Sequence, residues 1–182
     1  AFELRESGRS KRKPDPDSPN LLDGEIIRNS DGSPVKVPGM FKEVKCVGWY
    51  IDTFKRAQIS INFNNYKVLS IHDVYDAACK LADERSIRVT GSELVGLIPL
   101  EAILMAGRHY LAKQRRTVGV PEEDIIQAAV QSLGRNDVTP FIAEEKIIEY
   151  AVKESADELM SMSAQGFVNE LSTNSPAPGG GS

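Results

Sequence analysis

A row of uncharged polar side chains is the feature of this sequence best suited to bind a ligand. The stretch AQISINFN, residues 57–64, alternates strictly between apolar and polar residues. Successive side chains of a strand point to opposite faces, so the polar set shares one face. Amides and a hydroxyl there offer fixed donors and acceptors to a heterocycle. Alternatively, this face is only the solvent side of a two-layer sheet. The row consists of Gln58, Ser60, Asn62 and Asn64.

Two aromatic residues precede this row, in the apolar run VKCVGWYI at residues 44–51. Trp49 and Tyr50 are able to stack on a planar ligand, although a single Trp in a strand more often belongs to the core. The run as a whole is typical of a central strand covered on both faces. We therefore expect Trp49 and Tyr50 to shape the sheet beneath the polar row.

The residues that usually carry catalysis are sparse and separated. His72 and His109 fall on different predicted helices, so they predict no catalytic pair. Cys46 and Cys79 lie in apolar surroundings, without the spacing of metal ligands or a candidate base nearby. We expect no catalytic residue and no metal site within this chain.

A short basic cluster, RSKRK at residues 9–13, is the other charged feature. It could bind a polyanion such as a carboxylate-rich tail through charge-assisted hydrogen bonds. The alternative is a solvated linker, because Pro14, Asp15 and Asp17 follow at once and cancel much of the positive charge. The net charge of −4 and the pI near 5.3 argue against nucleic acid as a partner.

The composition is that of one ordinary globular domain with tails. Of 182 residues, 41% are hydrophobic and 26% charged, which excludes wholesale disorder and fibrous architectures. The sequence contains no apolar run of the roughly 20 residues that span a bilayer and no signal-peptide pattern at its start. We expect a cytoplasmic protein with no membrane partner.

The order of the predicted elements indicates an α+β fold. Alternation of period two gives way to helical periodicity after Ser70, which with Asp73 forms a capping-box-like start. This order predicts a two-layer sandwich with helices on one face of a mainly antiparallel sheet. The predicted strands cover 44–51, 57–64, 87–89 and 147–152, and the predicted helices cover 71–82, 99–111 and 121–133.

The ends of the chain have a different character from its centre. Residues 1–8 resemble the last turns of a preceding helix that ends at Gly8. Residues 9–39 are dense in Pro, Gly, Asp and Lys and predict a polar linker, with a small hairpin possible around 24–32. An amphipathic helical stretch begins at 153, and the last eleven residues lack core-forming side chains.

Seven motifs in order and at similar spacing resemble the glutamate formimidoyltransferase (formiminotransferase) family over about residues 1–150. The tail from Phe167, with SPAPGGGS, is similar to the start of the cyclodeaminase domain that follows the transferase in the bifunctional enzymes. The chain therefore resembles the C-terminal subdomain of such a transferase, truncated at the start of the next domain. The motifs are LRESG, VGWY, AQISIN, VTGSELVGLIP, LG, PF and KIIEY.

The resemblance implies a ferredoxin-like sandwich that supplies one wall of a folate-binding cleft. It implies formimidoyl transfer from N-formimidoylglutamate to tetrahydrofolate, a step of histidine degradation, with tetrahydrofolate as co-substrate and a homo-oligomeric complete enzyme. The acid-base histidine belongs to the N-terminal subdomain, so we expect this chain to be inactive alone. The resemblance assigns Gln58, Ser60, Asn62 and Glu93 to the folate cleft.

We expect the end of a preceding helix and a polar linker at 1–39 and the C-terminal transferase subdomain at 40–152. A linker and the truncated start of the cyclodeaminase domain follow at 153–182. A second interpretation stays open, because a fold does not fix a function. The chain could instead be a non-catalytic binding or assembly module that pairs with a separate partner subunit.

Overall fold

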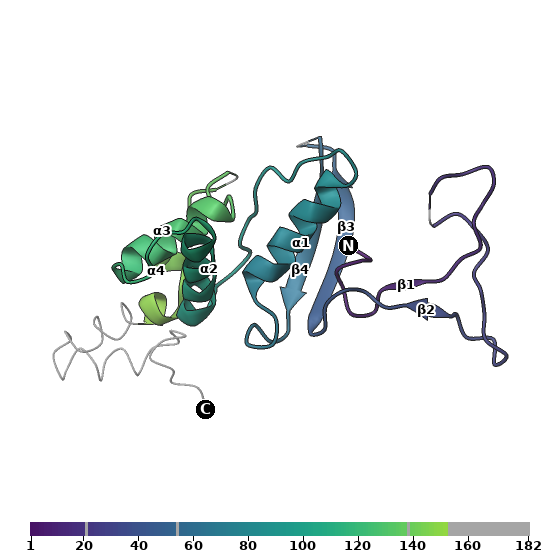
Figure 1. Cartoon of the computed structure of the whole chain (residues 1–182), viewed down its shortest axis with the longest axis horizontal. Helices are drawn as coiled ribbons and strands as arrows, with labels where there is room; N and C mark the ends of the chain where they lie inside the picture. Colours follow the sequence, from purple (N-terminus) through teal and green to yellow (C-terminus); the bar gives the residue numbers. More distant parts are fainter. Residues whose placement is uncertain (21, 54, 138, 153–182) are drawn as a thin grey trace, which may run out of the picture. The chain divides into compact units, whose positions relative to one another are not determined.

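The computed structural model describes residues 1–20, 22–53, 55–137 and 139–152. The chain divides into two compact units, Ala1–Val89 and Thr90–Ser182 (Figure 1). Each unit has its own buried residues and is described separately. The predicted helical stretch from 153 and the tail lie outside the described residues.

An antiparallel hairpin forms the sheet of the first unit. Its strands are β3 (Val44–Ile51) and β4 (Arg56–Phe63), paired from Val44 opposite Phe63 to Ile51 opposite Arg56. Both strands were predicted, and β4 begins one residue earlier than expected. The alternation of β4 is confirmed, because Ile61 and Phe63 pack into the core while Gln58 lies on the opposite face.

One helix covers one face of this hairpin. It is α1 (Ile71–Asp83), which starts as predicted where the Ser70 hydroxyl accepts a hydrogen bond from Asp73 N. Its Val74, fully buried, packs with Val44 and Cys46 of β3. This helix layer on an antiparallel sheet layer confirms the predicted α+β class.

The polar segment between the N-terminus and β3 is folded back on itself. Strands β1 (Arg9–Ser10) and β2 (Lys36–Val37) pair antiparallel. Three backbone hydrogen bonds close a ring across the extended pieces: Ile27 N donates to Lys11 O, Lys11 N to Val35 O, and Val35 N to Ile27 O. The Arg28–Pro34 bridge forms the small hairpin that the sequence predicted.

Two glycines stand where this segment leaves and rejoins the unit. Gly8 has φ +52°, which suits the residue that ends a helical turn, and residues 2–7 form turns. A Cβ on Gly8 would collide with the Val37 carbonyl, and one on Gly39 with the Arg5 carbonyl. The entry and exit of the segment therefore cross in backbone contact.

The second unit is a helical assembly. Helices α2 (Leu100–Lys113) and α3 (Glu122–Ser132) were predicted, and they approach closely at Gly107, where a Cβ would meet the Ile125 carbonyl. The short α4 (Ala143–Lys146) follows. Among the helices in the described part of the chain, none has both the length and the apolar character needed to cross a membrane.

Two predicted strands are not formed. Residues 87–89 have no strand pairing, because Ile87 N instead donates to Ala82 O and completes the end of α1. At 147–152, Ile147 forms one parallel bridge with Ile98, and residues 148–152 are helical. A short apolar run such as IIEYAV fits either structure by pattern alone.

Candidate functional site

The open face of the β3–β4 hairpin holds three of the four residues predicted to bind a ligand. Residues opposite each other in an antiparallel pair share a face. The register therefore sets Gln58 beside Trp49, Ser60 beside Val47 and Asn62 beside Lys45, on the face opposite α1. Figure 1 shows α1 lying along one side of the hairpin.

The prediction that β3 is covered on both faces is wrong. Val44 and Cys46 are buried against α1, but Val47 is 54% and Trp49 45% exposed. The segment 44–51 is mostly apolar, yet Lys45 lies on the same face of β3 as Val47 and Trp49. Its charge indicates that this face is the outer one. Trp49 is therefore a surface residue of this unit.

This face combines the groups that recognise a planar polar molecule. The Trp49 indole offers a flat apolar surface, and the Gln58 amide beside it offers both donors and an acceptor. At the other end of the row, Lys45 places a cation next to the Asn62 amide. Lys45 is not among the predicted site residues, although the alternation within VKCVGW indicates its place on this face.

Glu93 belongs to the second unit, so its place beside the polar row stays a prediction. Its side chain is exposed, whereas the neighbouring Ser92 is hydrogen-bonded to the end of α3. The Ser92 hydroxyl donates to Leu133 O at 2.6 Å, and Ser92 N donates to Gly134 O at 3.0 Å. The structure thus joins two of the sequence motifs, GSELVGL and LG.

The two histidines and the buried cysteine Cys46 lie in packed surroundings that do not suit catalysis. His72 is 9% exposed on α1, and His109 lies edge-on to Tyr110 with 5.0 Å between ring centroids. The Cys46 thiol donates to Ala1 O at 2.9 Å, and burial raises the pKa of Cys46. A thiol held protonated is a poor nucleophile, so Cys46 is suited to packing rather than to catalysis.

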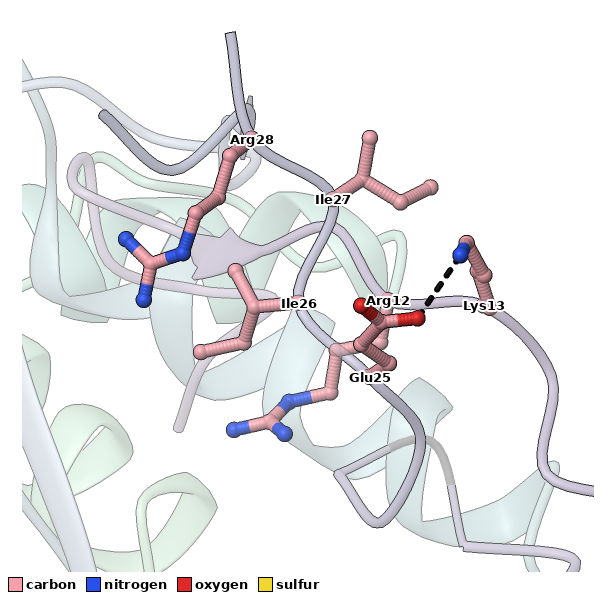
Figure 2. Close-up of a pocket in the computed structure, with 6 residues that line it drawn as sticks. All are labelled: Arg12, Lys13, Glu25, Ile26, Ile27 and Arg28. Atoms are coloured by element: carbon pink, nitrogen blue, oxygen red, sulfur yellow. Dashed lines mark hydrogen bonds and ion pairs between the residues drawn. The ribbon is translucent and has the colours of Figure 1, made fainter. Parts of the chain in front are cut away.

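A separate open pocket of about 550 Å³ lies in the folded-back segment (Figure 2). The sequence indicates only the basic residues at 12 and 13 of this pocket, because residues 25–28 are brought beside them by pairing between distant segments. Its lining residues are Arg12, Lys13, Glu25, Ile26, Ile27 and Arg28.

Comparison with known proteins decides the family. The formiminotransferase domain model matches residues 1–153, most of the chain. The chain belongs to the formiminotransferase domain family. The match includes the first unit and residues 90–153 of the second, so the family domain contains both the hairpin and helices α2 to α4.

The relatives of this chain are named as formimidoyltransferases, with or without a cyclodeaminase part. The chain is 41% identical over 148 residues to the formimidoyltransferase-cyclodeaminase of Dictyostelium discoideum, and 42% identical over 147 residues to that of Mus musculus. Each match covers 80% of this chain and 27% of the relative, so the chain spans about a quarter of their length. A glutamate formimidoyltransferase of Streptococcus pyogenes is 29% identical over 86 residues, 47% of this chain and 26% of that protein.

Proposed function

We propose that this chain supplies one wall of a folate site in the transfer of a formimidoyl group from N-formimidoylglutamate to tetrahydrofolate. The wall is the open face of the hairpin, with Gln58, Ser60 and Asn62 as polar contacts. We propose Glu93 as a further folate contact. Tetrahydrofolate is the co-substrate, and the transfer is a step of histidine degradation in the cytoplasm.

One observation carries this proposal. Within a domain of the formiminotransferase family, a row of amide and hydroxyl groups lies in register with an exposed Trp49 on an uncovered sheet face. A pterin is planar and rich in donors and acceptors, so an aromatic surface beside an amide row matches its shape and polarity. Lys45, at the end of the row, suits a carboxylate of the bound molecule.

We propose further that the chain binds folate weakly and does not turn over alone. His72 is packed in α1, and His109 lies edge-on to Tyr110, so we assign the acid-base role to neither of them. Proton transfer by a positioned side chain contributes about 10²–10⁴-fold to a rate. An acid-base histidine from an N-terminal subdomain would complete the site, and the complete enzyme would be a homo-oligomer.

Calorimetry with 5-formyltetrahydrofolate tests the proposal. The chain is titrated alone and then together with the N-terminal transferase half of a relative. We expect weak saturable binding that the added half strengthens. Gln58→Ala and Asn62→Ala should each weaken it, while Ser33→Ala, in the exposed loop of the first unit, should not.

Loss of affinity in the control to the same extent, or no binding with both halves present, would contradict the folate wall. A turnover assay with N-formimidoylglutamate completes the test. Robust transfer by this chain alone would overturn the proposed dependence on a second subdomain.

The exposed apolar residues of the same face favour a second candidate function. Val47 and Trp49 together give this side an apolar centre of the kind found in protein interfaces. A non-catalytic module that pairs with a separate partner subunit would cover them. Partner binding that Trp49→Ala abolishes, without any folate affinity in the complex, would support this function over the first.

A further inference from the structure

The pocket of the folded-back segment is distinct from the hairpin face and is built around two arginines that are 16 residues apart in the sequence. Arg12 is paired with Ile26 across an antiparallel bridge, so their side chains share a face. Arg28 lies two residues beyond Ile26 and therefore joins that face. Figure 2 shows the Arg12 and Arg28 guanidinium groups on the same side as Ile26, with Lys13 and Ile27 directed the other way.

Both guanidinium groups are held by the backbone. Arg12 Nη1 donates to Gly24 O at 2.7 Å, and Arg28 Nη1 donates to Gly32 O at 2.8 Å. Each bond uses one of five guanidinium N–H donors and fixes the direction of the others. Pre-orientation of this kind lowers the entropy that an arginine loses when it binds an anion.

Three carboxylates of this segment have partners other than the two pocket arginines. Glu25 accepts from Lys13 Nζ at 2.7 Å, and this bond lowers the pKa of Glu25. Asp23 accepts from the Ser18 hydroxyl at 2.6 Å, and Asp31 is bonded within its own turn. Within the part of the chain that the structure describes, neither pocket arginine forms an ion pair, so their positive charge is not cancelled at short range.

We propose that Arg12, Ile26 and Arg28 form a binding site for a small organic or inorganic polyanion with an oxyanion group at each end. Each guanidinium binds one terminal group through paired N–H donors. The Ile26 side chain between them contacts the middle of the ligand. Lys13 is excluded from this role by its bond to Glu25, so the site is not the basic run RSKRK but a pair formed by folding.

Phosphate and carboxylate termini satisfy the same donors, and pyrophosphate and succinate represent the two. Binding of each probe to the full chain is measured by chemical-shift titration of ¹⁵N-labelled protein at low and at physiological salt. We expect saturable shifts at residues 12 and 24–28, with affinity that falls as salt screens the charges. Whichever probe binds more tightly identifies the terminal group.

The variants Arg12→Lys and Arg28→Lys keep the positive charge but remove the paired N–H donors of the guanidinium group. Each should weaken binding roughly tenfold, which corresponds to about 1.4 kcal/mol. Lys36→Gln, which removes a cation of the same segment outside the pocket, is the matched control and should leave the affinity unchanged. The amide spectrum of each variant verifies that the segment keeps its pairing.

Two results would overturn the inference. One is the absence of saturable binding of both probes at low salt. The other is a loss of affinity in Lys36→Gln equal to that in the two arginine variants, which would show a diffuse response to net charge. Either result leaves the folate proposal untouched, because that proposal concerns the hairpin face.

Discussion

The helix pair α2–α3 of the second unit and the β3–β4 hairpin of the first differ in how they use their apolar residues. In the second unit, Ile103 and Ala106 of α2 are fully buried, and α3 approaches so closely that only a glycine fits at position 107. In the first unit, the hairpin has one face against α1 and one that exposes Val47 and Trp49. Close packing serves stability, whereas an uncovered face with aligned polar groups is free to bind. Substitutions should separate these two roles.

The largest expected difference is between truncations in the two regions. Ile103→Ala removes a fully buried side chain and should lower the free energy of unfolding by about 2–5 kcal/mol. Trp49→Ala, at a half-exposed position, should cost about 1 kcal/mol or less while it removes ligand or partner binding. Urea unfolding followed by circular dichroism measures both. A larger loss of stability in Trp49→Ala would contradict the division.

The contact between α2 and α3 gives the next effect. Gly107→Ala should destabilise the protein by about 1–3 kcal/mol, because overpacking against the Ile125 backbone outweighs the better helix propensity of alanine. Gly119→Ala is the matched control, since only Thr117 Oγ1 lies near its Cβ position, at 3.6 Å. Equal unfolding midpoints for the two variants would show that the helices move apart at little cost.

A smaller effect is expected at the start of α2. Pro99 provides no side-chain cap, and Glu149 Oε2 accepts from Leu100 N at 2.7 Å. Glu149→Ala should cost about 1 kcal/mol, as the loss of an N-cap does. Glu145→Ala, an exposed glutamate nearby, should change stability less. Similar unfolding midpoints for Glu149→Ala and Glu145→Ala would show that solvent replaces the cap without loss.

The smallest effect appears only in alkali. Burial, and then the 2.6 Å hydrogen bond to Glu122, raise the pKa of Tyr150 to about 12 from 10.0. The folded protein favours the neutral phenol, so the resulting stabilisation is complete below pH 10 and is lost as the pH rises toward 12. Absorbance titration at 295 nm of the protein minus Tyr150→Phe should show this late phenolate. A difference midpoint near 10 would contradict it.

Local signals predicted the elements that the chain forms locally. The alternation of 57–64 and the cap at Ser70 are enough to predict β4 and α1. Pro99 and Pro121 indicate the starts of α2 and α3. The strand prediction for residues 147–152 is wrong because this short apolar sequence is compatible with either a helix or a strand. Tertiary contacts decided between them, since the helical turn carries Glu149 to the start of α2.

The candidate sites divide in the same way. The row from Gln58 to Asn62 was predictable, since strand periodicity alone aligns it. Lys45 on the same face of β3 was the sequence signal for the exposure of Trp49. The coverage of a strand was not otherwise predictable, because it depends on helices elsewhere in the chain. Neither was the placement of Arg12 and Arg28 on one face, which requires the register between two extended pieces that share no hydrophobic pattern.

The close backbone contacts at Gly8 and Gly39 hold the two ends of segment 9–38 next to each other, as in a domain insertion. Because the ends are already in contact, a change in length alters only the loop-closure term, about 0.6 kcal/mol for a doubling. Natural or engineered sequences could grow, shrink or be exchanged there while the β3 register and the α1 contacts stay in place. The segment is thus a point of entry for new recognition functions on an otherwise unchanged transferase domain.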